Sequence, residues 1–152
     1  MPAPILEVRD LRVEYATPRG SVQAVSGVDF DVHKGEFVGV VGESGCGKST
    51  MLFGIARLLS PPAGITGGSV LFHGQNLVQM TEKELNTLRW RDYSVVMQSA
   101  MNALNPVLTI GAQFEDAILA HGKFSGKEIK DRSVEVMRLV AIDPIHLKSY
   151  PH

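Results

Sequence analysis

A glycine-rich run that ends in a lysine and two hydroxyl residues carries the clearest chemistry in this sequence. It reads Gly42-Glu43-Ser44-Gly45-Cys46-Gly47-Lys48-Ser49-Thr50. Two glycines five positions apart, followed by Lys and Ser, match the P-loop pattern that cradles phosphates. Glycine tolerates positive φ and has no Cβ, so the backbone can wrap closely around phosphate oxygens. The pattern therefore predicts a phosphate-binding loop.

The residue types at the end of the run suit ATP with its Mg²⁺. The backbone N–H groups of such a loop point inward, and a helix that begins near Lys48 adds the positive end of its dipole. We expect Lys48 to reach the β- and γ-phosphates, Ser49 to offer its hydroxyl to Mg²⁺, and Thr50 to support the loop or the α-phosphate. We interpret Cys46 as a spacer that points away from the phosphate, because no histidine lies near it in sequence to activate its thiol.

The segments that flank the loop are those a P-loop requires. Residues 37–41 are a continuous apolar run, which predicts a strand buried on both faces as in a parallel sheet. Residues 51–59 have helical character and stop before Pro61-Pro62. This context favours a nucleotide-binding loop over a glycine-rich strand–helix turn without a ligand.

The remaining patterns predict an α/β chain. Alternating apolar residues predict strands at 11–15 and 28–32 upstream of the loop, and shorter apolar runs predict strands at 70–72 and 93–97. Capping boxes at Thr81/Glu84 and Ser125/Glu128 predict helices that run towards Trp90 and to Ile142. A further helix is predicted over 109–120.

Composition excludes several classes of protein. The chain has 152 residues, 15 Lys+Arg against 16 Asp+Glu, and 44% hydrophobic residues, which excludes a disordered or fibrous protein. The near-neutral charge gives no basic face for nucleic acid. The first residues have neither the cationic start nor the apolar region of a signal peptide, so we expect none here, and no apolar run reaches the roughly 18 residues of a membrane span. With a single cysteine, we expect a soluble intracellular protein.

The residues around the loop resemble the ATP-binding subunits of ABC transporters. The resemblance is carried by the phrase Ala24-Val25-Ser26-Gly27-Val28-Asp29-Phe30, by Gly35-Glu36 and by the strands before the loop. It implies that Tyr15, 27 residues before Gly42, stacks on adenine. From the residues alone, Tyr15 could instead be a core aromatic on an alternating strand.

A second landmark is Gln98, which ends the phrase Val95-Val96-Met97-Gln98 and is similar to the family's Q-loop glutamine. The resemblance implies that Gln98 touches Mg²⁺ or the attacking water and links the site to a helical subdomain. Taken alone, a glutamine after a strand is a solvated loop residue. The run Ala100-Met101-Asn102-Ala103-Leu104-Asn105-Pro106 and the phrase Pro61-Pro62-Ala63-Gly64-Ile65 resemble the oligopeptide and dipeptide (and nickel) importers.

This resemblance implies a fold and a set of partners. The fold class is α/β, an incomplete P-loop NTPase core of the ABC type with an antiparallel β subdomain at its N-terminus and the start of a helical subdomain. The whole chain is then part of one ATP-binding domain, with segments 1–41, 42–98 and 99–152. The implied partners are a second ATP-binding subunit, identical or different, and transmembrane permease subunits. The implied location is cytoplasmic, peripheral on the inner face of the cell membrane, without a span of its own.

Motifs that the family needs for hydrolysis are missing from this sequence. The signature LSGG, the Walker B strand with its Asp, the catalytic Glu and the switch His do not occur before His152. Residues 139–143 have the Walker B form, but Pro144 follows where the catalytic Glu should stand. Because Ile129, Val136 and Val140 keep helical spacing, we interpret 139–143 as a helix end.

We therefore assign no catalytic residue in this chain and expect a truncated or fragmentary ATPase subunit that cannot hydrolyse ATP alone. Without the two parallel strands that the resemblance places beside it, the strand at 37–41 would have unpaired edges. Two alternatives stay open: a nucleotide-binding module without catalysis, including half of a split subunit, and a small P-loop kinase. The kinase is disfavoured because some forty residues precede the loop and the arginines are scattered.

Overall fold

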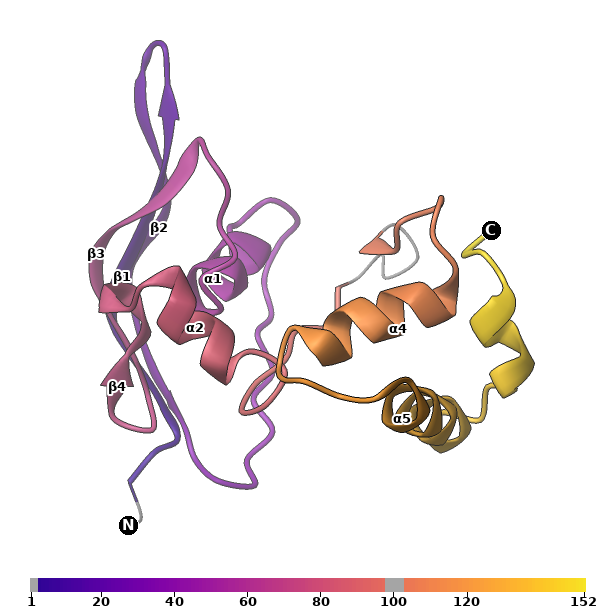
Figure 1. Cartoon of the computed structure of the whole chain (residues 1–152). Helices are drawn as coiled ribbons and strands as arrows, with labels where there is room; N and C mark the ends of the chain where they lie inside the picture. The colour runs from indigo at the N-terminus through magenta and orange to yellow at the C-terminus, as the bar shows by residue number, and fades with distance from the viewer. Residues whose placement is uncertain (1–2, 98–102) are drawn as a thin grey trace. The chain divides into compact units, whose positions relative to one another are not determined.

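The computed structural model describes residues 3–97 and 103–152, which fold as two units, Met1–Tyr93 and Ser94–His152. In the first unit, an antiparallel sheet has the strand order β2-β1-β3-β4. Its strands are β1 (Leu6–Thr17), β2 (Gly20–Val32), β3 (Ala63–Phe72) and β4 (Gln75–Asn76). Figure 1 shows β1 and β2 as a long hairpin at the edge of this unit. The strands predicted at 11–15, 28–32 and 70–72 are confirmed, each within a longer strand.

An irregularity in β1 sets which side chains face the core. Val8, Leu11 and Val13 are all fully buried, although Val8 and Leu11 are an odd number of positions apart. The register with β2 shifts between Val8 and Leu11, and Asp10 has a φ of 45°. Such a bulge inserts a residue and restores the following side chains to the same face. The strand therefore presents one continuous apolar face.

Two helices complete the core of this unit. They are α1 (Lys48–Ile55) and α2 (Glu82–Leu88), with the short 3₁₀ helix η1 (Leu77–Gln79) before α2. Both helices lie beside the sheet in Figure 1. Met51 from α1 and Leu85 from α2 join one buried cluster with the apolar residues of β1 and β3. Both predicted helices exist. α1 ends before the predicted residue 59, and Arg57 just after it takes a left-handed backbone conformation, whereas α2 runs towards Trp90 as predicted.

The apolar run 37–41 is not a strand in the structure, so the prediction of a strand buried on both faces is wrong for this chain. Phe37 and Val41 are 99% and 93% exposed. A strand requires hydrogen-bonded neighbours, and the strands that the structure describes pair with one another and leave none beside 37–41. The strand predicted at 93–97 fails for the same reason: Tyr93 makes an isolated bridge to Arg89, and Val96 is exposed.

The second unit is helical in its described part. It contains α4 (Ile110–Leu119), α5 (Gly126–Leu139) and the 3₁₀ helix η2 (Pro144–Lys148). The helix predicted over 109–120 is confirmed, whereas α5 ends at Leu139 instead of Ile142. Ala141 has a φ of 57°, and the Asp143 side chain accepts from the N–H of Ile145 to start η2. Residues 139–143 are thus a helix end, as predicted, and not a Walker B strand.

Both predicted capping boxes are confirmed. At the start of α5, the N–H and the hydroxyl of Ser125 each donate to a Glu128 carboxylate oxygen at 2.7 Å, and the Glu128 N–H donates back to the Ser125 hydroxyl. These bonds, first that from the hydroxyl and then that from the backbone, hold the pKa of Glu128 below its ordinary value. Thr81 also holds the pKa of Glu84 below its ordinary value, first through its backbone N–H and then through its hydroxyl.

Substituting Glu128→Gln tests this cap through pH. Because the folded-state pKa is lowered, the ionised carboxylate stabilises the fold above its ordinary pKa of 4.5, and this contribution is lost as pH falls through the folded-state value. The free energy of unfolding of the unaltered chain should therefore fall more steeply below the ordinary pKa than that of Glu128→Gln. Urea unfolding across this range measures it, with Glu115→Gln on the exposed part of α4 as control. Parallel curves for Glu128→Gln and the unaltered chain would contradict the role of the cap.

Replacing a large side chain by alanine should have different effects on stability in the core and in the exposed run 37–41. Leu85→Ala removes a side chain with no exposed surface, so the free energy of unfolding should fall by about 2–5 kcal/mol. Phe37→Ala removes a larger side chain that is 99% exposed and should change it by less than about 0.5 kcal/mol. Urea unfolding of the 152-residue chain compares the two. A large loss with Phe37→Ala would show that 37–41 is a buried strand after all.

Candidate nucleotide-binding site

The P-loop sequence forms an exposed loop that leads into the start of α1. Residues 42–46 are exposed, Gly45 and Gly47 have φ values of 81° and 95°, and Gly47 caps the helix that begins at Lys48, as predicted. These left-handed conformations are accessible to glycine at little cost. The free N–H groups at the start of a helix are suited to bind an anion. The backbone thus has the form that phosphate binding requires.

The start of α1 is held by a close approach to the sheet. A Cβ on Gly47 would lie 2.4 Å from the carbonyl oxygen of Ala24 in β2, a distance no side chain could occupy. Further along the helix, a Cβ on Gly54 would lie 3.2 Å from the Val13 side chain of β1. Met51, between the two glycines, is buried in the core. Packing of α1 on the β1–β2 hairpin therefore holds the C-terminal end of the loop.

The ammonium of Lys48 is bonded to the loop itself. Its Nζ donates to the carbonyl oxygens of Gly42 and Glu43 at 2.8 Å and 2.6 Å. The exposed Cys46 has its sulfur 3.6 Å from the same nitrogen. A phosphate that binds in the loop must draw the ammonium from these carbonyl oxygens to its own oxygens.

The structure brings Tyr15 to the loop. Its hydroxyl lies 3.1 Å from the Thr50 hydroxyl in the first turn of α1, within hydrogen-bonding distance. Tyr15 is half-buried, in contrast to the fully buried Leu11 and Val13 of the same strand. Tyr15 therefore contacts the first turn of α1 and is not among the fully buried residues of the core.

Of the other predicted site residues, three are exposed and one lies outside the residues that the structure describes. The side chains of Glu43, Ser44 and Ser49 are exposed beside the loop. Gln98 lies outside the residues that the structure describes. Within the described part of the chain, no three His, Cys, Asp or Glu side chains gather as a metal site. The exposed Ser49 hydroxyl fits Mg²⁺ bound with a nucleotide, since Mg²⁺ takes few protein ligands and completes its octahedron with phosphate oxygens and water.

Two contacts around the loop were not predicted from the sequence. One is the approach of Gly47 to the Ala24 carbonyl, and the other is the bond between Thr50 and Tyr15. Each joins positions more than twenty residues apart, and no local spacing in one sequence pairs such positions. The small side chain of Ala24 opposite a glycine at a helix start is consistent with the first contact, but it does not identify it.

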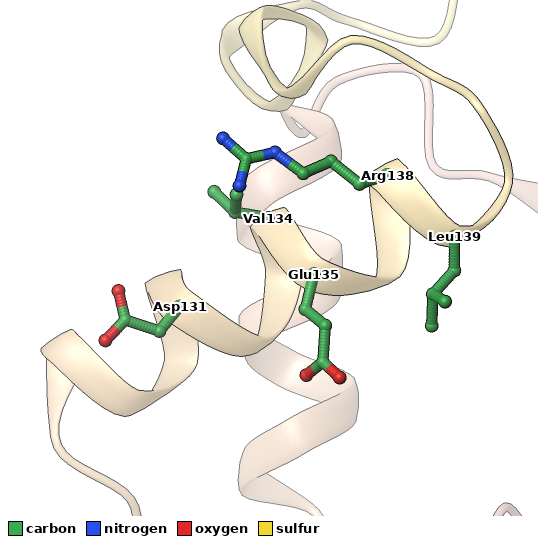
Figure 2. A pocket seen from close by; sticks show the side chains of 5 residues that line it. All are labelled: Asp131, Val134, Glu135, Arg138 and Leu139. Carbon is green, nitrogen blue, oxygen red and sulfur yellow. The ribbon is translucent and has the colours of Figure 1, made fainter.

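A surface hollow on α5 does not form a second candidate site. It is lined by Asp131, Val134, Glu135, Arg138 and Leu139. Figure 2 shows that these side chains spread along the helix and that their charged ends point away from one another. The Glu135 carboxylate is 2.7 Å from Arg132, its ion-pair partner. Ligand sites in proteins have polar groups that converge, so the hollow offers nothing for a ligand to bind.

Over residues 3–97 and 103–152, no helix combines the length and apolar character needed to cross a membrane.

Comparison with known proteins identifies the class. The family model described as ABC transporter matches residues 25–149. This chain is 44% identical over 151 residues to the dipeptide transport ATP-binding protein DppD of Bacillus subtilis (strain 168), covering 97% of this chain and 45% of that protein. It is 40% identical over 150 residues to the oligopeptide transport ATP-binding protein OppD of Salmonella typhimurium, covering 97% and 44%. The chain therefore belongs to the ABC transporter family, and it spans less than half the length of these relatives.

Solved structures of the same class share the fold. The dimeric structure of MJ0796, described as a bacterial ABC transporter cassette, matches with a TM-score of 0.78 and 25% identity, covering 96% of this chain and 61% of that one. A second match of the same quality is a post-hydrolysis state of MJ0796 bound to ADP and Pi. The predicted fold class, an incomplete P-loop core of the ABC type, and the resemblance to the peptide-importer branch are thus confirmed.

The two left-handed glycines of the loop provide a matched test of the docking of α1. Gly47→Ala places a Cβ against the Ala24 carbonyl oxygen, whereas Gly45→Ala places one in open space. Both pay about 1–2 kcal/mol for a left-handed residue with a side chain. Gly47→Ala should therefore lower the free energy of unfolding clearly more than Gly45→Ala in urea titrations. Equal losses would mean that α1 does not lie against β2 at this point.

Proposed function

We propose that this chain is the nucleotide-binding N-terminal part of the ATP-binding subunit of a peptide importer, with segments 1–41, 42–98 and 99–152 of one domain. The observation that carries the proposal is the loop at the start of α1, with two left-handed glycines and the Lys48 ammonium folded into it. Membership of the ABC transporter family and the names of the relatives, peptide transport ATP-binding proteins, support the substrate class.

In this proposal each loop residue has a role toward ATP and Mg²⁺. The backbone of Gly42, Glu43, Ser44, Gly45, Cys46 and Gly47 surrounds the phosphates. Lys48 neutralises the β- and γ-phosphates, and Ser49 offers its hydroxyl to the metal, which screens the charge between the phosphates. Tyr15 stacks on adenine and Gln98 approaches the metal. The nucleotide named for the MJ0796 structure, ADP, supports a nucleotide in the corresponding loop of this chain.

Binding without hydrolysis is the activity we propose for the 152-residue chain by itself. Hydrolysis requires a residue that orients the attacking water and a carboxylate on the metal. Gln98 would contact the metal or the attacking water, but the family's catalytic Glu and Walker B Asp do not occur in this sequence, and the exposed Glu43 matches neither of them. We propose that a second ATP-binding subunit faces this half-site and places its signature motif opposite the loop, as the dimeric cassette structure suggests.

The transporter assembly is the wider setting of the proposal. The relatives are named as ATP-binding proteins of dipeptide and oligopeptide transport, which implies permease subunits as partners. We propose a position on the inner face of the cell membrane, where ATP is available and the permease can be reached. Closure of two ATP-binding subunits around ATP would then be passed to the permease.

The exposed run 37–41 also supports a second candidate, half of a split subunit. Its apolar side chains are exposed and its backbone has no partner strand in the described part of the chain. Exposed, unpaired apolar segments of this kind are suited to pair with another strand. Such a strand would come from a longer form of the same polypeptide in the leading proposal, and from a separate chain in this one.

Equilibrium binding of Mg-ATP to the 152-residue chain tests the proposed function. Lys48→Ala removes a charge-assisted contact and should weaken binding by about tenfold or more. Lys83→Ala removes the same charge from the exposed face of α2 and should leave the affinity unchanged.

Phosphate release should stay at the background of a protein-free control in all three samples. Equal affinity of the Lys48→Ala variant and the unaltered chain would refute the assignment of the loop. Turnover that is lost with Lys48→Ala would overturn the proposal of binding without hydrolysis.

A further inference from the structure

The hydroxyl pair of Tyr15 and Thr50 links the strand that carries the aromatic ring to the helix that carries the phosphate loop. We propose that Thr50 is a positioning residue for Tyr15: its hydroxyl holds the phenol in place, so that the ring meets the base of a bound nucleotide in a fixed orientation. This inference rests on the proposed function, because it concerns the base-dependent part of nucleotide affinity.

Both ends of this link are anchored. Tyr15 lies in β1, paired with Val22 of β2 on one side and with Ala63 of β3 on the other, so its backbone cannot shift. Thr50 lies in the first turn of α1, which is fixed by the close approach of Gly47 to Ala24. The remaining freedom of the Tyr15 ring is rotation about its side-chain bonds. A hydrogen bond at the far end of the ring restricts this rotation.

A threonine hydroxyl can make two hydrogen bonds at once, one to the tyrosine beside the base and one to a phosphate oxygen. It has one proton to donate and two lone pairs. Thr50 can therefore accept a hydrogen bond from Tyr15 and still donate to a phosphate oxygen at the start of the helix. Affinity depends on how many groups are already ordered before the ligand arrives. A ring held in place by Thr50 loses less entropy when the base stacks on it.

A bond that only ties β1 to α1 would behave differently from a positioning bond. Loss of a purely structural tie lowers the stability of the unit and weakens all ligands of the loop in the same proportion. Loss of a positioning bond weakens those ligands that carry a base. The dissociation constant of inorganic triphosphate divided by that of ATP separates the two cases. The contacts to the phosphates contribute to both constants and cancel in this ratio.

The experiment measures both dissociation constants, with Mg²⁺, by titration calorimetry on the 152-residue chain. Tyr15→Phe keeps the ring and removes its hydroxyl, and Thr50→Val keeps the shape and removes the partner. Each should lower the ratio by about two- to tenfold, the effect of one hydrogen bond. The double variant should show no further loss, because both substitutions remove the same bond. Thr50→Ser retains the hydroxyl and should retain the ratio.

Tyr93→Phe is the matched control. It removes a phenol hydroxyl that donates to the Ala56 carbonyl oxygen at 3.3 Å in the same unit, away from the loop. It should leave the ratio at the value of the unaltered chain. If Thr50→Val fails to show the native far-ultraviolet circular dichroism, then the comparison of Tyr15→Phe with Thr50→Ser decides.

The other outcomes show whether the positioning role of Thr50 or the proposed nucleotide-binding function is wrong. A ratio that Tyr15→Phe and Thr50→Val leave unchanged overturns the positioning role, as do losses that add in the double variant. Equal affinity of the unaltered chain for triphosphate and ATP also overturns it, while the phosphate loop stands. Absence of binding by both ligands, or binding that Lys48→Ala does not weaken, refutes the proposed function itself and the positioning role with it.

Discussion

The close approach of α1 to the β1–β2 hairpin is the contact on which the candidate site depends. At its tightest point, a Cβ on Gly47 would be 2.4 Å from the Ala24 carbonyl oxygen, so only glycine fits there. The same glycine has the left-handed conformation that turns the loop into the helix. One residue therefore satisfies two demands: it shapes the phosphate loop, and it lets the helix dock. Buried Met51 then secures the docked helix in the core.

The parts of this structure that could be predicted from the sequence are those whose signals are local. The P-loop pattern and the capping boxes of Thr81 and Ser125 each involve residues within a few positions, and the structure contains all of them. Their stabilising contacts form between neighbours in the chain, so the sequence alone specifies them. The bulge at Asp10 and the bond between Tyr15 and Thr50 depend on segments that are distant in the sequence, and no local sequence pattern predicts them.

The strand predicted at 37–41 is absent, which shows that an apolar run alone is not enough to predict a strand. An apolar run indicates that a segment would gain from burial, but a strand is a property of a pair, because its N–H and C=O groups need partners. In the described residues, β1, β2, β3 and β4 pair with one another and none pairs with 37–41. Phe37 is consequently 99% exposed in spite of a sequence that favours burial. The prediction of a buried strand at 37–41 was therefore wrong for this chain.

The two ends of the phosphate loop are consequently held by different means. The C-terminal end is packed on the sheet through Gly47 and Met51, whereas the N-terminal end continues the unpaired run 37–41. At that weaker end, Lys48 donates to the carbonyl oxygens of Gly42 and Glu43 and ties the loop to its own helix. Phosphate competes for the same ammonium, so binding exchanges this tie for contacts to the ligand. Pairing of 37–41 with neighbouring strands would hold the loop without the tie and leave the ammonium free for phosphate. In the proposed function, the charge that recognises the nucleotide therefore also orders the loop.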